Sequence, residues 1–297
     1  MERRRLGRTG MDVGALGFGG SEIGYERASV ATVSRLLGQA LDAGLDVIDT
    51  AECYERSEEL IGEALGARRR ECRIFTKCGH PRGWGRGDWR KASLLSSIER
   101  SLERLRTDHV DLVQLHSCSE DVLRRGEVIE ALETARRRGL ARFIGYSGDG
   151  AAARRAVECG AFDTLQTSVS VADQEALHLT LPLAAERGIG VIAKRPIANA
   201  AWLLGKPPSR GDYEHEYWRR LRLLDYPFLS REDSVAVALR FTLSVPGVAV
   251  AIVGTRKPGR FEENVRAASR GPLPPAEFAA IRARWSEVAD PSWTGQV

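Results

Sequence analysis

The stretch VIDTAECYERSEELIG, residues 47–62, joins a short apolar run to an amphipathic helical pattern. Val47 and Ile48 are typical of a buried strand, and the run that follows Tyr54 has helical spacing with acidic residues in its first turn. Asp49 comes directly after the apolar pair, although burying a carboxylate is costly. The pattern predicts a strand that ends at Asp49, a short connection that carries Tyr54, and then a helix.

The same order of strand and helix recurs along the chain. Alternating strands and helices indicate parallel strands joined by right-handed crossovers, and eight such units in 297 residues favour a closed (β/α)8 barrel of the TIM type. The predicted strands are residues 13–20, 46–51, 73–78, 110–116, 141–147, 162–169, 190–196 and 248–254. Helical patterns that lie between them include residues 29–44, 57–69, 91–106 and 127–139, several of which end at glycine.

A doubly wound sheet is the alternative for this order, but its phosphate-binding fingerprint is missing. The glycines of LGFGGSEIG, residues 16–24, do not fit the G-x-G-x-x-G pattern. We therefore predict one (β/α)8 domain over residues 1–297, with residues 6–17 as an N-terminal hairpin that caps the barrel floor. Residues 197–233 are rich in aromatic side chains and too long for an ordinary connection, so we expect a long loop over the mouth after the seventh strand.

The composition limits the classes of partner. The net charge of +4 is small, and acidic residues are interspersed among the basic ones, so we expect no nucleic-acid partner. Five cysteines without a C-x-x-C pair argue against a disulfide framework or a zinc site, so we predict no metal and a reducing, cytoplasmic location. No uncharged apolar run reaches about 18 residues, so we predict no membrane span. The sequence leaves the oligomeric state open.

Charged side chains stand at the ends of three consecutive predicted strands: Asp49, Lys77 and His116. Singly, each has an ordinary explanation, as a turn former, a lysine that reaches solvent or a hydrogen-bonded polar group. Their joint occurrence at the carboxyl ends of barrel strands, where the active sites of such barrels lie, favours chemistry. Lysine is rare in this arginine-rich chain, and it can tune its pKa where arginine cannot.

Together with Tyr54, these residues form a plausible proton-transfer group. A phenol is a poor acid at neutral pH unless a nearby cation stabilises the phenolate, and Lys77 is suited to that task. Asp49 would keep Lys77 charged and oriented. His116 would hydrogen-bond a substrate oxygen beside the phenol.

The chain resembles the aldo-keto reductase family along nearly its whole length. The segments IDTAECYERSEELIG, FTKCG and DHVDLVQLHS are similar to the segments that carry the family's catalytic tetrad. Asp49, Tyr54, Lys77 and His116 match that tetrad in identity and order. The resemblance implies that Tyr54 donates a proton to a carbonyl oxygen while a nicotinamide cofactor delivers hydride to the carbon.

The resemblance also implies cofactor contacts. Ser147 and Gln166 would hold the nicotinamide amide, and VGTRKPGRFEEN, residues 253–264, resembles the segment that grips the adenosine phosphate. Arginine suits bidentate phosphate binding, which favours NADP(H) over NAD(H), although an exposed basic first turn of a helix is the alternative. The full set of implied cofactor residues is Gly20, Ser21, Ser147, Gln166, Lys194, Gly254, Thr255, Arg256, Arg260, Glu263 and Asn264.

Several positions depart from the family pattern. Glu55 replaces the glycine after the tyrosine, Gly148 replaces an asparagine, and Val169-Ser170 replaces a Tyr-Asn pair. The seventh strand ends in AKRP, so Lys194 or Arg195 occupies the place where many relatives have an aromatic residue under the nicotinamide. Trp202 is a candidate to cover the ring instead.

Cysteines stand within two residues of the tetrad at Cys53, Cys78 and Cys118. A nearby lysine lowers a thiol pKa, so one hypothesis is an activated, oxidation-sensitive thiol. The alternative is small apolar packing.

The sequence thus predicts an NADP(H)-dependent oxidoreductase that reduces an aldehyde or ketone, or oxidises the alcohol in reverse, with a small-molecule carbonyl compound as substrate. One alternative is a cofactor-binding regulatory or redox-sensing barrel with little turnover. Another is a Schiff-base aldolase that uses Lys77, because barrels host many chemistries.

Overall fold

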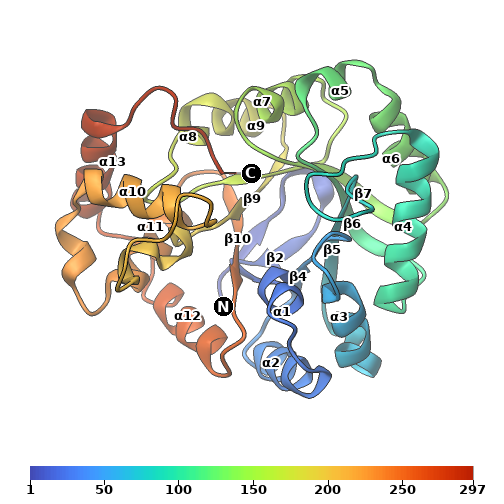
Figure 1. Ribbon diagram of the computed structural model, residues 1–297, viewed down its shortest axis with the longest axis horizontal. Coiled ribbons are helices and arrows are strands. Elements are labelled where there is room, and N and C mark those ends of the chain that lie inside the picture. Colours follow the sequence, from blue (N-terminus) through green and yellow to red (C-terminus); the bar gives the residue numbers. More distant parts are fainter. Residues whose placement is uncertain (297) are drawn as a thin grey trace.

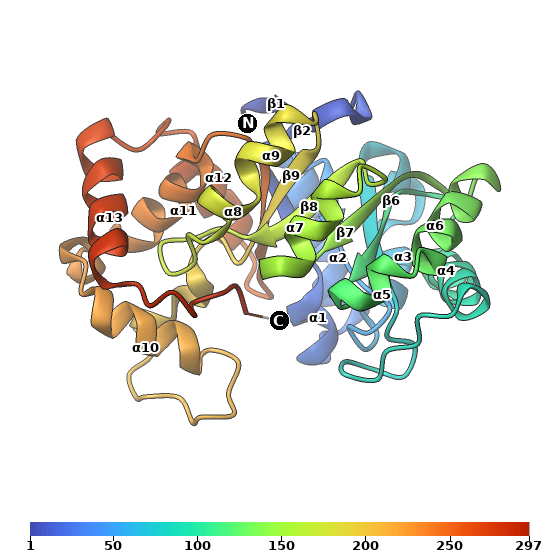
Figure 2. The same cartoon turned by 90° about the horizontal axis from the view of Figure 1, so that it is seen from above.

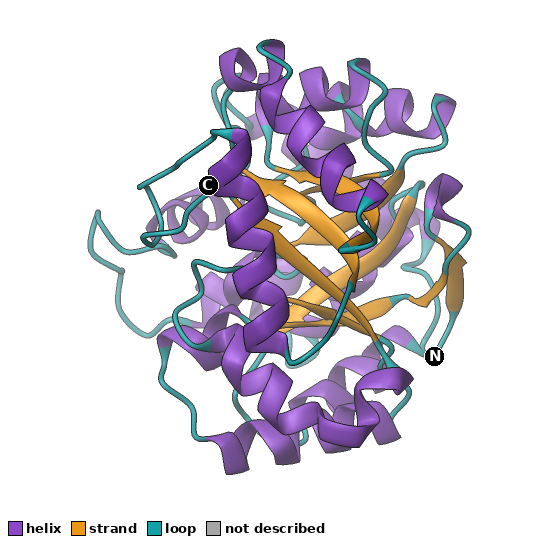
Figure 3. Cartoon of the chain, turned by 90° about the vertical axis from the view of Figure 1, so that its right-hand side faces the viewer, coloured by secondary structure: helices purple, strands orange, loops and turns teal. Residues whose placement is uncertain are grey.

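The computed structural model of the protein describes residues 1–296. Within that range, eight parallel strands close into a barrel, with helices packed around the outside (Figures 1 and 3). In the order in which they pair, the strands are β10 (Val248–Gly254), β3 (Leu16–Gly19), β4 (Val47–Asp49), β5 (Arg73–Cys78), β6 (Val110–His116), β7 (Ala141–Ser147), β8 (Thr164–Ser168) and β9 (Gly190–Lys194). Each lies within one predicted strand, so the (β/α)8 barrel is confirmed.

The described helices alternate with the strands as the pattern predicts. They are α1 (Ser21–Tyr25), α2 (Val30–Asp42), α3 (Ser57–Leu65), α4 (Lys91–Leu105), α5 (Glu120–Arg124), α6 (Glu127–Arg137), α7 (Gly150–Glu158), α8 (Ala176–Leu179), α9 (Leu181–Glu186), α10 (His215–Leu224), α11 (Ser234–Ser244), α12 (Arg260–Ala268) and α13 (Pro275–Val288). Ser29 caps α2 by accepting a hydrogen bond from the backbone N–H of Thr32, at 3.1 Å. None of these helices is long and apolar enough to cross a membrane.

A short hairpin closes one end of the barrel. Strand β1 (Arg3–Arg5) pairs antiparallel with β2 (Asp12–Gly14), and the 3-10 turn η1 (Gly7–Thr9) lies between them. Gly7 has a φ of 49°, and a Cβ there would lie 2.2 Å from the backbone nitrogen of Gly190, where β9 begins. The turn therefore packs on the amino ends of the strands, which confirms a hairpin on the barrel floor. Figure 2 shows the hairpin and α10 at opposite ends of the molecule.

The barrel interior is apolar near the amino ends of the strands and polar near their carboxyl ends. Side chains of Val47, Phe75, Leu112 and Ile192 form one buried cluster with residues of β10 and the hairpin. Because side chains alternate along a strand, the residues two positions further on also face the barrel axis, nearer the carboxyl ends. Those residues are Asp49, Lys77, Gln114 and Lys194. The strands thus place two lysines and a carboxylate around the mouth.

Residues 197–233 are more ordered than a single loop. They contain the 3-10 turn η3 (Ala198–Leu203), helix α10 and the 3-10 turn η4 (Pro227–Ser230). Ala198, Asn199 and Ala200 all have positive φ, which places a strained turn just after β9. The predicted long excursion after the seventh strand is present, and part of it lines the mouth.

Candidate active site

A cavity of about 690 Å³ opens at the carboxyl ends of the barrel strands. All four predicted tetrad residues, Asp49, Tyr54, Lys77 and His116, line it. So do six of the predicted cofactor residues: Gly20, Ser21, Ser147, Gln166, Lys194 and Gly254. Its volume falls in the range of about 300–1,000 Å³ that is typical of sites for small molecules and cofactors.

Lys77 is buried at the base of this cavity and is paired with Asp49. Its Nζ atom lies 2.6 Å from Oδ2 of Asp49 and 2.8 Å from the carbonyl oxygen of Thr50, and its side chain is 1% exposed. Burial of an unpaired ammonium group at this depth would cost a large desolvation free energy. The Asp49 carboxylate is the counter-charge that makes the burial of Lys77 possible. Oδ1 of Asp49 is buried without a hydrogen-bond partner among the described residues.

Tyr54 lies in the turn between β4 and α3. The backbone N–H of Tyr54 donates to the carbonyl of Ala51, and its own carbonyl accepts from the N–H of Ser57. Its ring centroid lies 5.1 Å from Nζ of Lys77 and 5.6 Å from the ring centroid of His116. Burial raises the pKa of the Tyr54 phenol well above its ordinary value of 10, and the Asp49 carboxylate adds to the effect. The phenol is therefore protonated at neutral pH.

His116 ends β6 and is held neutral. Burial lowers the pKa of its imidazole well below the ordinary 6.5, and the Lys77 ammonium adds to the shift. Nδ1 lies 3.4 Å from Sγ of Cys53, whose pKa burial raises to about 12. An un-ionised thiol at this distance can donate to Nδ1, and the ring proton then resides on Nε2. His116 would in that state offer a neutral N–H donor.

Ser147 and Gln166 line the same cavity from β7 and β8. They are paired in the register of β7 and β8, and both are buried. Gln166 accepts a hydrogen bond from the side-chain amide of Gln114 through Oε1, at 3.2 Å. Gln166 and Ser147 both line the cavity. A carboxamide, which has one acceptor and two donors, fits this pair.

The predicted adenosine-binding residues lie beyond the cavity. It reaches Gly254 at the end of β10, whereas Thr255, Arg256, Arg260, Glu263 and Asn264 are not among its lining residues. Arg256 is paired with Glu26, and Nη1 of Arg260 lies 2.6 Å from Glu263. The first turn of α12, which follows Gly259, also presents backbone N–H groups that favour anions. The structure gathers these residues in one place, with both arginines already paired to carboxylates.

The protein matches the model of the aldo/keto reductase family over residues 15–286. The chain belongs to the aldo-keto reductase family.

The similarity to individual proteins also covers nearly the whole chain. The chain is 30% identical to the uncharacterized oxidoreductase YqkF of Bacillus subtilis, over 95% of this chain and 96% of that protein. It is also 30% identical to L-galactose dehydrogenase of Arabidopsis thaliana, over 90% and 88%. Among solved structures, the holo form of the aldo-keto reductase AKR11C1 from Bacillus halodurans superposes with a TM-score of 0.83, at 27% identity and 96% coverage of both chains. Family and relatives support an oxidoreductase that acts on carbonyl compounds.

In this aldo-keto reductase, Glu55 occupies a backbone position that suits glycine. Its φ is 50°, in the left-handed region, and its side chain is exposed. The residue thus stores local strain beside Tyr54.

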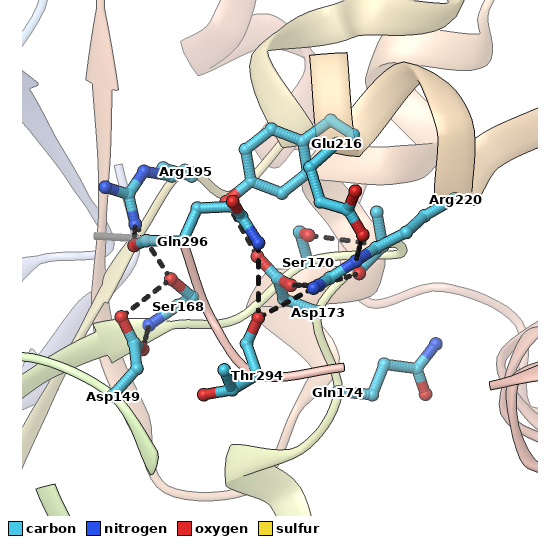
Figure 4. Close-up of polar contacts among 12 residues, drawn as sticks. Asp149, Ser168, Ser170, Asp173, Gln174, Arg195, Glu216, Arg220, Thr294 and Gln296 are labelled. Carbon is cyan, nitrogen blue, oxygen red and sulfur yellow. Dashed lines mark hydrogen bonds and ion pairs between the residues drawn. The ribbon is translucent and has the colours of Figure 1, made fainter. Parts of the chain in front are cut away.

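The end of β9 carries a second buried ion pair, which the sequence did not reveal. Nζ of Lys194 lies 2.8 Å from Oδ2 of Asp149, a residue just after β7. Asp149 also accepts from the backbone and side chain of Ser168 (Figure 4). It accepts from the Thr167 hydroxyl as well. A D-G pair after a predicted strand indicates a turn and gives no sign of a charge partner on another strand.

The expectation for Trp202 is wrong. Its indole N–H donates to Oγ of Ser234, at 3.2 Å, and it packs against the core without lining the cavity. Tyr213 lines the cavity from the same excursion and stacks on the Arg195 guanidinium, at 5.0 Å from the ring centroid. The direction of a side chain in an irregular segment is not set by any sequence period.

Burial opposes the hypothesis of an activated thiol, because it disfavours the thiolate form. Burial raises the pKa of Cys53 and of Cys118 to about 12, and that of Cys78 well above its ordinary value of 9. The Lys77 ammonium opposes the shift at Cys53 without cancelling it. These thiols are therefore protonated packing groups.

Aromatic side chains line the cavity near Tyr54 and His116, and the Trp84 loop lies beside the pocket, as the sequence predicts. Trp84 is 44% exposed, lines the cavity and meets the His116 ring edge-on, with centroids 4.8 Å apart. Its loop is anchored by the buried carboxylate of Glu52, which accepts from the backbone N–H groups of Gly79 and His80 at 2.7 and 2.9 Å. Tyr25 lies on the other side, 5.8 Å from Tyr54 between ring centroids.

Proposed function

We propose that the protein is an NADPH-dependent carbonyl reductase in which Tyr54 donates the proton. The observation that carries the proposal is the arrangement of one cavity. It is lined by a protonated phenol, a buried ammonium–carboxylate pair and a neutral imidazole, together with Ser147 and Gln166, a pair of side chains suited to a carboxamide. This arrangement supports hydride transfer to a carbonyl carbon with proton transfer to its oxygen.

NADPH would supply the hydride when it is bound, and the protein's own residues do the rest. Ser147 and Gln166 would hold the carboxamide of the nicotinamide. The Tyr54 hydroxyl and the Nε2–H of His116 would both point at the carbonyl oxygen, and negative charge grows there as the carbon–oxygen double bond is reduced. Tyr54 gives up its proton to that oxygen, and the Lys77 ammonium stabilises the phenolate that remains.

The preference for NADPH over NADH would come from the region beyond Gly254. The side chains of Arg256 and Arg260 are 59% and 45% exposed, and α12 begins at Arg260. A 2′-phosphate could displace the carboxylates of Glu26 and Glu263 from these guanidinium groups and would gain bidentate contacts. The substrate is expected to be a small aldehyde or ketone that fits between Tyr25, Tyr54 and Trp84.

The proposal is tested by following cofactor absorbance with a panel of aromatic aldehydes, short aliphatic aldehydes, ketones and dicarbonyl compounds. We expect turnover with NADPH and weaker turnover with NADH. An Arg260→Ala variant should raise the KM for NADPH and leave that for NADH nearly unchanged. Tight binding of NADPH with no turnover of any carbonyl compound would instead support a regulatory, cofactor-sensing barrel.

A further inference from the structure

The mouth of the barrel holds a second inward-facing lysine besides Lys77. Lys194 is two residues beyond Ile192 of the barrel interior, so its side chain faces the same axis. It lines the cavity, and its side chain is 14% exposed. Lys194 is paired in register with Ser168, two residues beyond Gln166 on β8. The ammonium group therefore lies on the side of the cavity where Ser147 and Gln166 stand.

Asp149 fixes Lys194 in this place. The Asp149 side chain is 3% exposed, and its oxygens accept from Oγ1 of Thr167 and the backbone N–H of Ser168, both at 2.7 Å, as well as from Lys194. A carboxylate that accepts this many hydrogen bonds is strongly stabilised as an anion. The ion pair thus joins the end of β9 to the connection between β7 and α7, and Lys194 also donates to the carbonyl of Gln296, at 3.5 Å.

Arg195 adds a further positive charge to the same wall. Its guanidinium donates to neutral oxygens, at 3.0 Å to Oγ of Ser168 and also to the carbonyl of Gln296 (Figure 4). It also donates to the hydroxyl of Tyr213. Nearby Asp173 is already paired with Arg220. Among the described residues, Lys194, Arg195 and Asp149 therefore form a group of two cations and one carboxylate, with one positive charge in excess.

The oxidised and reduced nicotinamide rings differ by one positive charge. The ring of NADP⁺ is cationic and that of NADPH is neutral, whereas the phosphates of the two forms are alike. We propose that Lys194, with Arg195 beside it, makes this site discriminate against NADP⁺ and favour NADPH. The inference rests on the proposed function, because Ser147 and Gln166 must hold the nicotinamide for its ring to lie beside Lys194.

The effect has a direct consequence for the reaction. Repulsion between unit charges a few ångströms apart in a partly shielded site is large enough to change an affinity ratio by about tenfold. A site that favours NADPH is biased toward reduction and releases NADP⁺ more readily after hydride transfer. Lys194 would thus act as a residue that determines specificity for the redox state of the cofactor.

Equilibrium titration of the full-length protein with NADPH and, separately, with NADP⁺ tests the inference. Burial lowers the pKa of Lys194 to about 8, with Arg195 adding to the shift, so the titrations are run at pH 7, where the ammonium form predominates. Protein fluorescence gives each Kd without any turnover. In Lys194→Met, which keeps side-chain length and removes the charge, the ratio of Kd for NADP⁺ to Kd for NADPH should fall by about tenfold. In Lys194→Arg, which keeps the charge, that ratio should stay near the wild-type value.

The outcomes separate this inference from the proposed function. Equal weakening of both Kd values in Lys194→Met would mean that Lys194 contacts a group common to both cofactors, such as a phosphate, and would overturn the inference. An unchanged ratio would overturn it as well. If the wild-type protein binds neither dinucleotide, the proposed function fails and the inference fails with it. Circular dichroism of each variant shows that the barrel is intact.

Discussion

The Lys77 ammonium nitrogen lies 2.6 Å from Oδ2 of Asp49, and both side chains are almost fully buried. Neither group would be stable at this depth without the other, because the desolvation of a lone charge exceeds what a few hydrogen bonds return. The pair therefore has two roles in our account. It maintains a cation near the ring of Tyr54, and it prevents an uncompensated charge in the barrel.

Removal of one partner should be more harmful to stability than removal of both. Lys77→Met leaves the Asp49 carboxylate buried and unpaired, and we expect it to lower the free energy of unfolding by about 3 kcal/mol. The double variant Lys77→Met, Asp49→Asn should recover most of that loss while remaining inactive. Urea unfolding of the two variants and the wild type provides the measurement. A double variant no more stable than Lys77→Met would show that the cost does not come from the lone carboxylate.

The pH dependence should differ between the two directions of the reaction. Burial raises the pKa of Tyr54 well above 10 and lowers that of His116 well below 6.5, so the reducing form, a protonated phenol with a neutral imidazole, persists from about pH 7 to 9. We expect the rate of carbonyl reduction in a single turnover, which does not include release of NADP⁺, to be nearly flat over that range. Alcohol oxidation needs the phenolate, whose fraction rises tenfold per pH unit below the pKa, so its rate should climb steeply. A reduction rate that falls steeply between pH 7 and 8 would contradict this assignment.

Glu55→Gly should stabilise the protein. The wild-type residue has a φ of 50°, which costs an L-residue about 1 kcal/mol, and the gain is partly offset by the greater freedom of glycine in the unfolded chain. We expect a gain of about 0.5–1 kcal/mol in thermal or urea unfolding. Glu55→Ala is the control, because it removes the carboxylate but keeps the Cβ and should give no such gain. If both variants stabilise equally, the charge and not the backbone is the cause.

Mild peroxide should leave turnover unchanged. The thiols of Cys53, Cys78 and Cys118 are buried and their pKa values are raised, so little thiolate exists at neutral pH. Cys159 is only partly buried and serves as an internal comparison. Mass spectrometry after alkylation at pH 7.5 should find Cys159 labelled well before Cys53. Rapid loss of activity with labelling at Cys53 would restore the activated-thiol hypothesis.

Strands whose apolar side chains follow a regular pattern along the chain could be predicted from the sequence. Each barrel strand lies inside a predicted apolar run, and the alternation of side chains correctly placed His116 toward the mouth. Strand β1 was missed because its three exposed or half-exposed arginines show no apolar alternation. Three of the four predicted tetrad residues, Asp49, Lys77 and His116, were recognisable because they stand at strand ends, where barrel geometry brings distant segments together.

Contacts that depend on closure of the barrel could not be predicted. The pairing of Lys194 with Asp149 joins the ends of strands separated by β8, and each residue alone looks like a turn or a surface charge. The side-chain direction of Trp202 depends on the left-handed backbone at Ala198–Ala200, which no propensity indicates. The anchoring of the Trp84 loop by Glu52 likewise depends on where β5 and α4 meet the β4 turn.

The Tyr54→Phe variant isolates the role of the phenol oxygen in proton transfer. It removes one oxygen and leaves the ring that packs near Lys77 and His116. In a single-turnover measurement of NADPH oxidation by an accepted aldehyde, the account predicts a rate lower by about 10²- to 10⁴-fold, with the Kd for NADPH unchanged. Wild-type turnover by Tyr54→Phe would show that the proton comes from another group.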